Sequence, residues 1–262
     1  MKQYVVDAFA DNVFEGNPAA VCVMDKWLDD TLMQKIAIEN NLSETAFVVR
    51  EEDHYRLRWF TPGKEVDLCG HATLGTAYVL ANYYKPDETR FEFDTLSGRL
   101  IVTRKGDLYE MDFPSRMPEP VEVTEAMIDA LNGMKPLDAY LSRDLMLLLP
   151  DERSVQDFVP DWNKIKAVPE GMGLLITARA DNDEYDFVSR CFFPKILVNE
   201  DPVCGSAHCN FVPFWAERLG KDEMTAHQIS SRGGIVYCRN DKERVYLSGK
   251  AVLYSEAEIH VS

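Results

Sequence analysis

The chain has 262 residues and carries 44 acidic side chains against 28 Lys and Arg, which gives a formal net charge of −16 at pH 7. This charge opposes binding to nucleic acids and to anionic membrane surfaces. No apolar run approaches the roughly 20 residues that a membrane-spanning helix requires. Six cysteines without a CxxC pair fit a reducing compartment, so we expect a soluble, cytoplasmic protein with no nucleic-acid or membrane partner.

The first third of the chain predicts strands around one amphipathic helix. Residues 3–9 have the apolar pattern of a strand. From Leu28 to about Asn41, apolar residues at helical spacing predict a helix, with acidic residues in its first turn where the helix dipole favours them. A strand follows whose entry carries Glu44, and residues 55–60 alternate between apolar and basic side chains as a half-buried strand does.

A segment without charged residues then predicts a buried helix. Residues 70–84 contain no Asp, Glu, Lys or Arg, and small residues recur along them. A helix that is apolar on all sides is buried on all sides, and its small residues let neighbouring elements approach closely. Strands are predicted next at 90–95, 98–104 and 107–113, joined by two hairpin turns that contain glycine.

The second half repeats this plan. A helix capped by Thr124 and strands at 173–180 and 185–193 are predicted before a second segment without formal charge, at 204–216. Because proline cannot donate a backbone hydrogen bond, Pro213 is expected to kink or shorten the helix of this segment. The closing strands are predicted at 235–240, 244–254 and 257–261.

Both charge-free segments follow a Cys-Gly turn, LCGHAT in the first half and VCGSAH in the second, and an aromatic-X-Pro strand end precedes each turn. We infer a duplicated α+β unit. The chain is predicted to form two pseudo-symmetric domains, residues 1–115 and 116–262, each a curved, mostly antiparallel sheet or barrel wrapped around a central buried helix. The division allows for the last strand to pack back on the first half.

The two Cys-Gly turns predict helix entrances that bind an anion. The first N–H groups of a helix have no partner inside the helix, and the helix dipole favours negative charge beside them. Two entrances that face each other across a cleft between the domains would bind a substrate carboxylate. The backbone groups concerned belong to Gly70, His71, Ala72, Gly205, Ser206 and Ala207.

Groups that can transfer protons lie near these turns. Apolar surroundings would raise the pKa of Glu44 into the range of a general acid or base, whereas the alternative for this residue is a surface cap or ion pair. His71 is expected at the mouth of the cleft or, alternatively, in the core and bonded to a carbonyl. Asp201 and Ser206 are expected to face the site even if they only cap the second helix.

The runs GNPAAV, NLSETAFV, FTPGKEVDLCGHATLGTA and EDPVCGSAH occur in this order. Together they resemble the PhzF-like proteins of phenazine biosynthesis, which have the diaminopimelate epimerase-like fold, over essentially the whole chain. The resemblance implies a cofactor-independent isomerase with its site between two domains. By position it implies catalytic roles for Glu44, His71, Asp201 and Ser206, with Glu44 moving a proton between two carbons of a carboxylate-bearing substrate.

Two cysteines depart from the pattern of the phenazine enzyme, which has a small residue at the position of Cys69 and usually threonine at that of Cys204. Related epimerases and racemases place two proton-transferring cysteines at these turns. A two-base epimerase or racemase using Cys69 and Cys204 is therefore an alternative, since a thiolate at a helix N-terminus has a lowered pKa. His71 stands where those enzymes have asparagine, and this difference counts against the two-cysteine mechanism. A non-catalytic small-molecule binding protein is the third hypothesis.

We expect no cofactor and no metal. A zinc site of Cys69, His71, Cys204 and His208 would have suitable ligand types, but Cys-X-His is not a usual zinc spacing, and helix N-termini repel a cation. The expected partner is a small carboxylate substrate, and the expected assembly is a homodimer, the common state of soluble enzymes.

Overall fold

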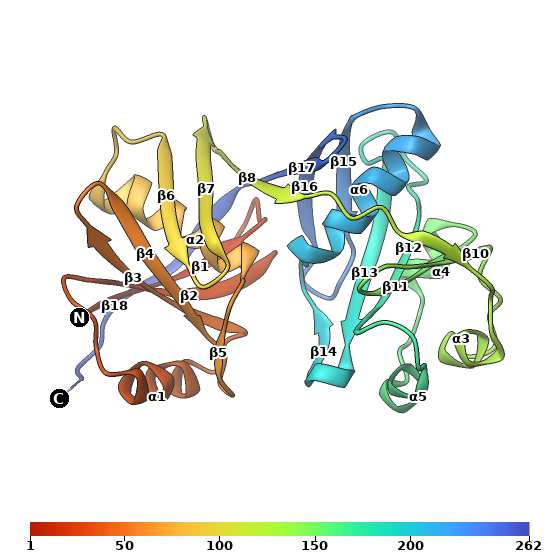
Figure 1. Cartoon of the computed structure of the whole chain (residues 1–262), viewed down its shortest axis with the longest axis horizontal. Helices are drawn as coiled ribbons and strands as arrows, with labels where there is room; N and C mark the ends of the chain where they lie inside the picture. The colour runs from red at the N-terminus through yellow and green to blue at the C-terminus, as the bar shows by residue number, and fades with distance from the viewer. Residues whose placement is uncertain (262) are drawn as a thin grey trace. The chain divides into compact units, whose positions relative to one another are not determined.

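The computed structural model describes residues 1–261, which divide into two compact units (Figure 1). The first unit contains residues 1–112 and the C-terminal stretch from Ser248, and the second contains residues 113–247. The chain passes into the second unit within β8 (Leu108–Pro114) and returns within β17 (Arg244–Gly249).

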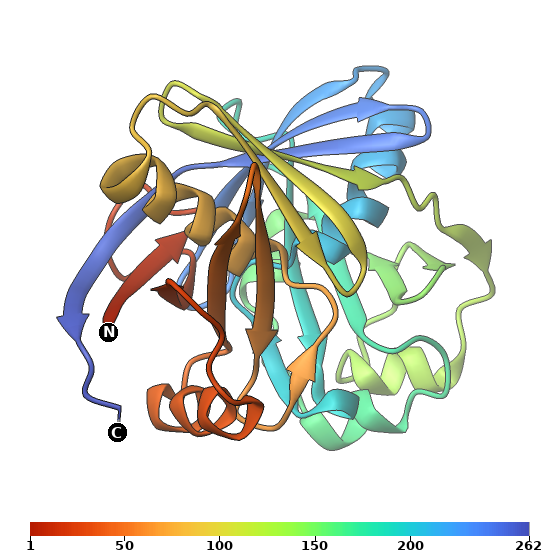
Figure 2. The ribbon, with the colours of Figure 1, turned by 60° about the vertical axis from the view of Figure 1, so that its left-hand side comes forward.

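In the first unit, strands surround one buried helix. β1 pairs antiparallel with β2 and with β18, β2 pairs parallel with β3, β3 pairs antiparallel with β4, and β4 pairs parallel with β6. Pairing of β1 with β18 places the first strand of the chain beside the last (Figure 2). The N-terminal amine donates to the carbonyl of Ile259 at 3.0 Å. Besides β8, the elements of this unit are β1 (Lys2–Ala8), β2 (Asn17–Met24), α1 (Asp30–Asn40), β3 (Glu44–Glu51), β4 (His54–Phe60), β5 (Glu65–Val66), α2 (Gly70–Val79), η1 (Leu80–Tyr84), β6 (Arg90–Thr95), β7 (Gly98–Lys105) and β18 (Ala251–Glu258).

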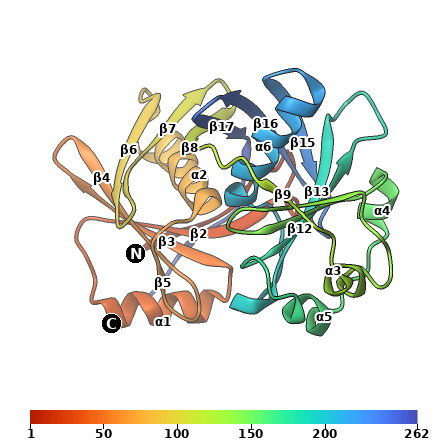
Figure 3. The same ribbon diagram turned by 45° about the vertical axis from the view of Figure 1, so that its right-hand side comes forward.

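Helix α2 is buried along nearly its whole length, as its lack of charged residues predicts, and lies against β1, β2 and β3 (Figure 3). At Gly75 the missing side chain leaves the helix backbone close to Val6 of β1. The segment predicted as one helix over 70–84 differs in its last turn. From Leu80 the helix widens into the π-helical turn η1, in which the N–H of Lys85 donates to the carbonyl of Leu80 at 2.7 Å.

The second unit has the same pairing plan. β10 pairs antiparallel with β9 and β11, β11 pairs parallel with β12, β12 pairs antiparallel with β13, and β13 pairs parallel with β15. This equivalence confirms the duplicated α+β unit that the Cys-Gly repeat predicts. Its elements are β9 (Glu119–Val121), α3 (Glu125–Ala130), β10 (Asp138–Leu141), β11 (Leu145–Leu148), α4 (Glu152–Gln156), α5 (Trp162–Ala167), β12 (Leu174–Arg179), β13 (Phe187–Phe193), η2 (Pro194–Ile196), β14 (Val198–Asp201), α6 (Gly205–Leu219), β15 (Glu223–Gln228) and β16 (Gly234–Asp241).

Helix α6 continues through Pro213 to Leu219, so the expected shortening is wrong. Pro213 has no N–H to donate to the carbonyl four residues earlier, that of Cys209. The backbone N–H of Arg116 supplies the missing bond, at 2.9 Å. A donor from outside the helix thus satisfies the carbonyl that proline leaves open, and the helix does not have to end.

Most predicted element boundaries agree with the structure to within a few residues. Asp29 caps α1 by accepting from the N–H of Thr31, and Thr124 caps α3. The strands predicted at 244–254 and 257–261 are wrong in their division, because β17 ends at Gly249 and β18 runs from Ala251 to Glu258. No helix in the described part of the chain combines the length and apolarity needed to cross a membrane.

Candidate active site

Glu44 is the first residue of β3, placed there by the sharp end of helix α1. Asn41 adopts a left-handed conformation, and its N–H donates to the carbonyl of Ala37, which ends the helix. The side-chain amide of Asn40 then donates to Oγ1 of Thr45 at 3.0 Å and holds the start of the strand. The residues that follow Glu44 are buried, as the apolar run TAFVV predicts.

The carboxylate of Glu44 lies beside the entrance of α2. Its Oε2 is 3.1 Å from Nε2 of His71, and 18% of the side chain is exposed against 8% for His71. The Sγ of Cys69 lies 3.6 Å from Nδ1 of His71. The contact between Glu44 and His71 has the distance of an ion pair. These three side chains form the first cluster of the site.

The pKa of Glu44 is lowered, which corrects the expectation of a raised value. Burial by itself would raise this pKa, but the charge of His71 and hydrogen bonds from His71 and Cys69 outweigh burial. The apolar strand on which the expectation of a raised pKa is based is present in the structure. The sequence did not reveal that two polar side chains from the next helix would contact the carboxylate. Glu44 is therefore held in its ionised form.

Neither buried helix has a side-chain cap at its N-terminus. Cys69 is the N-cap residue of α2 and Cys204 that of α6, and neither side chain accepts a cap hydrogen bond. The expectation that Asp201 or Ser206 caps α6 is therefore wrong for the N-cap position, which Cys204 occupies. Asp201 ends β14, and its carbonyl accepts from Nε2 of Gln228 at 2.6 Å. Oε1 of Gln228 in turn accepts from the N–H of Cys204 at 2.9 Å.

Ser206, in the first turn of α6, is engaged by an arginine. Its Oγ accepts from Nη2 of Arg143 at 2.9 Å and lies 3.3 Å from Sγ of Cys204. Arg143 also pairs at 2.9 Å with Asp144, whose side chain is fully buried. Burial opposes the charge of Arg143, but the adjacent Asp144 carboxylate raises the pKa of the guanidinium overall. A fixed cation thus lies at the entrance of α6.

Sequence reasoning missed Arg143, Asp144 and Gln228. They lie far from the Cys-Gly motif along the chain, and nothing in the run SRDL distinguishes a site arginine from a surface one. One feature of the sequence could have indicated the ion pair. Asp144 directly precedes the apolar run LMLLL, and a carboxylate beside a buried strand needs partners.

His208 belongs to the core. Its Nδ1 donates to the carbonyl of Cys204 at 2.8 Å, its ring lies near those of Phe187 and Phe211, and no part of it is exposed. Burial lowers the pKa of His208 to about 4, against the opposing effect of the bond to Cys204. The ring is therefore neutral at pH 7 and is not placed to exchange protons with a ligand.

The repeat shows which residue occupies the position of Glu44 in the second unit. Thr45 pairs with Phe60 and Leu174 pairs with Phe192, and each Phe begins an aromatic-X-Pro strand end. The residue before Leu174, and thus the counterpart of Glu44, is Gly173.

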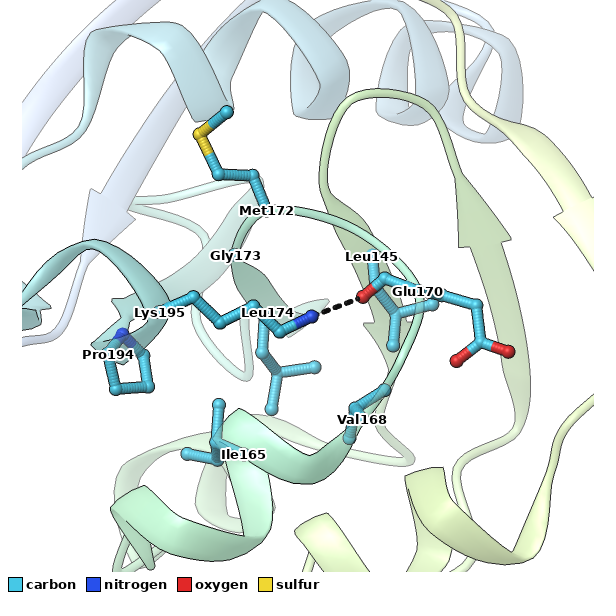
Figure 4. Close-up of a pocket in the computed structure, with 9 residues that line it drawn as sticks. All are labelled: Leu145, Ile165, Val168, Glu170, Met172, Gly173, Leu174, Pro194 and Lys195. Carbon is cyan, nitrogen blue, oxygen red and sulfur yellow. Dashed lines mark hydrogen bonds between the residues drawn. The ribbon is translucent and has the colours of Figure 1, made fainter.

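Gly173 lines a small, mainly apolar pocket (Figure 4). Lys195, which also lines it, donates to the backbone carbonyls of Glu170 and Gly171. A Cβ at Gly173 would lie 2.3 Å from the ring of Phe193. The second unit therefore has no room for a carboxylate at the position that Glu44 occupies in the first.

Comparison with known proteins identifies the family. The model of the family described as "Phenazine biosynthesis-like protein", PhzC-PhzF, matches residues 6–257. An uncharacterized isomerase of Pseudomonas aeruginosa is 48% identical over 258 residues, which cover 98% of each chain. A crystal structure of a PhzF family protein from Enterococcus faecalis is 50% identical, covers 99% of both chains and superposes with a TM-score of 0.97.

A more distant match supports the fold alone. The crystal structure of a probable proline racemase from Agrobacterium radiobacter K84 is 11% identical and has a TM-score of 0.61 over all of this chain and 93% of that one. Together with the full-length matches, this similarity confirms the expected epimerase-like α+β fold. The chain belongs to the PhzC-PhzF family of phenazine biosynthesis-like proteins and is an isomerase of that type.

Proposed function

We propose that this isomerase moves a proton between two carbons of a small carboxylate-bearing substrate, with Glu44 as the general acid and base. The observation that carries the proposal is the contact of the Glu44 carboxylate with His71 at 3.1 Å in a largely buried setting. A carboxylate held in its ionised form is ready to accept a proton at neutral pH.

The reaction needs one proton and no change of oxidation state. A carbon–hydrogen bond of the substrate breaks, its proton passes to Glu44, and its electron pair shifts into the adjacent unsaturated system. A new carbon–hydrogen bond then forms at another carbon with a proton returned by Glu44. His71 stabilises the carboxylate while it is ionised and is displaced from one oxygen when that oxygen is protonated, so it sets the position and basicity of Glu44.

The substrate carboxylate is proposed to bind at the uncapped helix entrances, through the backbone N–H groups of Gly70, His71 and Ala72 in α2 and of Gly205 and Ser206 in α6. Uncapped first turns favour an anion. Arg143, 2.9 Å from Oγ of Ser206, adds a positive charge to the second entrance. Asp201 remains a proposed site residue through its place directly before that entrance.

Exchange of substrate hydrogen with solvent deuterium tests this function. Glu44→Gln keeps the shape of the side chain and removes the base, so exchange should fall by about 10³-fold, within the usual range for loss of a general base. Glu52→Gln, at an exposed position of the same unit, is the matched control and should exchange at the wild-type rate. Exchange that survives Glu44→Gln would contradict the assignment.

The two-cysteine epimerase is kept as a second candidate because Cys69 and Cys204 occupy equivalent N-cap positions. Under that mechanism Cys204→Ser, rather than Glu44→Gln, abolishes exchange. A protein that binds small carboxylates without turnover would show binding in wild type and no exchange in any form.

We further propose that the enzyme works in the cytoplasm as a homodimer and without a cofactor. Six buried cysteines that form no disulfide suit a reducing compartment. Sedimentation velocity at micromolar concentration tests the dimer, and a monomer there would contradict it.

A further inference from the structure

The cluster at the entrance of α2 contains three different metal-binding groups. The carboxylate of Glu44, the thiol of Cys69 and the imidazole of His71 bring their ligand atoms within 4.8 Å of one another. Among residues 1–261 these are the only three such side chains that gather in this way. We propose that they form a binding site for Zn²⁺ and similar divalent transition metals, and that a bound metal inhibits the enzyme.

The distances fit a tetrahedral ion. Zinc lies about 2.3 Å from a thiolate sulfur, 2.0–2.1 Å from an imidazole nitrogen and 2.0–2.2 Å from a carboxylate oxygen, so neighbouring ligand atoms are roughly 3.4–3.6 Å apart. Nε2 of His71 lies 3.1 Å from Oε2 of Glu44 and 3.9 Å from Sγ of Cys69. Each of these two distances lies about 0.3 Å from that range. The carboxylate oxygen and the sulfur lie within 4.8 Å of each other, so small side-chain rotations would place all three atoms on one ion and leave a fourth position for water.

The charges also balance. A carboxylate, a thiolate and a neutral imidazole around Zn²⁺ give a site with no net charge, which removes the conflict between a cation and the positive end of α2. The ion takes the place of the proton between Glu44 and His71, so binding releases protons and strengthens as pH rises. Glu44 is the exposed edge of the cluster, with 18% of its side chain accessible, and provides the route of entry.

The entrance of α6 supplies an internal control. Cys204 occupies the equivalent N-cap position, but its Sγ lies 3.3 Å from Oγ of Ser206, and the guanidinium of Arg143 donates to that oxygen. Serine is a poor zinc ligand. The nearby carboxylate, that of Asp144, is already paired with Arg143 at 2.9 Å and is not available to a metal. The two cysteines therefore have the same place in the repeat and opposite suitability for a metal.

Titration with Co²⁺ tests binding without reference to turnover. A cobalt–thiolate bond gives a charge-transfer band in the near ultraviolet. We expect this band at one equivalent in wild type and in Cys204→Ser, and its loss in Cys69→Ser. Glu44→Gln and His71→Gln should weaken binding about tenfold or more, because each removes a ligand. Zn²⁺ should displace Co²⁺, since it stands above it in the affinity order.

Absence of the band in wild type, or its persistence in Cys69→Ser, would overturn the site. Circular dichroism of each variant checks that it is folded. Glu44→Gln and Cys69→Ser preserve side-chain shape, so the test stands even if His71→Gln fails to fold.

Inhibition rests in addition on the proposed function, because only a catalytic Glu44 is disabled by ligation. Zn²⁺ should stop deuterium exchange in wild type, and EDTA should restore it. Co²⁺ binding together with exchange that survives Glu44→Gln would refute the proposed function and leave the metal site standing. Loss of exchange in Glu44→Gln, together with no Co²⁺ binding in wild type, would refute the metal site and leave the proposed function standing.

Discussion

The entrances of α2 and α6 have the same backbone and different chemistry. Each begins with a Cys-Gly turn without a side-chain cap, and at each a side chain four residues later bonds the N-cap carbonyl. Oγ1 of Thr73 donates to the carbonyl of Cys69 at 2.6 Å, and Nδ1 of His208 to that of Cys204 at 2.8 Å. The first entrance carries an ionised carboxylate and a histidine, the second a serine and an arginine. Duplication conserved the scaffold, and the roles of the two copies diverged through single side chains.

The largest expected effect on stability is the pH dependence that His208 gives to the free energy of unfolding of the second unit. When unfolded, His208 takes up a proton below its ordinary pKa of 6.5, whereas the folded ring stays neutral down to about pH 4. The unfolded state then binds more protons in this window, so the free energy of unfolding should fall by about 3 kcal/mol between pH 6.5 and 4. His208→Thr, which copies Thr73, should remove this loss. Urea unfolding curves of both proteins at the two pH values measure it. An equal change in the free energy of unfolding between the two pH values in both proteins would contradict the prediction.

Gly173→Ala tests why the second unit carries no counterpart of Glu44. The new methyl group would lie 2.3 Å from the buried ring of Phe193, so the variant should lose about 1–3 kcal/mol of stability from overpacking. Thermal unfolding measures the loss. Gly173→Ala combined with Phe193→Leu should recover part of it, and wild-type stability of the single variant would show that the ring moves freely.

Arg143→Gln probes the division of roles between the two entrances. Since Arg143 is proposed to attract the substrate carboxylate and not to transfer a proton, KM should rise about tenfold, equivalent to about 1.4 kcal/mol, with little change in kcat. Steady-state kinetics separate the two constants. A fall in kcat comparable with that of Glu44→Gln would mean that both entrances take part in proton transfer.

Gly75→Ala should have the smallest effect, with the opposite sign to Gly173→Ala. A methyl group there would meet Val6 at 3.6 Å, an ordinary contact, and alanine favours the helix over glycine by about 0.5–1 kcal/mol. We expect a slightly higher melting temperature. A clear destabilisation would show that α2 and β1 are packed more tightly than the distance indicates.

Pattern alone predicted much of the fold. Helix α2 was recognisable because a segment of helical length without charged residues has to be buried, and the duplication because both Cys-Gly turns follow the same strand end. Glu44 stood out as a polar residue opening an apolar strand. The effect of Pro213 does not follow from local rules, because the donor that compensates for it, Arg116, lies almost a hundred residues earlier in the chain.

The sequence by itself determined the class of fold and the two buried helices, because periodicity, charge and turn residues act over a few neighbouring positions. Its motifs point to Glu44 as the candidate base through their resemblance to the PhzF-like proteins. Only the tertiary structure decided what surrounds Glu44. Contacts with His71 and Cys69 reverse the pKa shift that burial alone would cause, Arg143 adds a cation to the second entrance, and Phe193 fills the place that a second carboxylate would need. Electrostatic and packing energies depend on distances between side chains that are remote along the chain, and folding is what sets those distances.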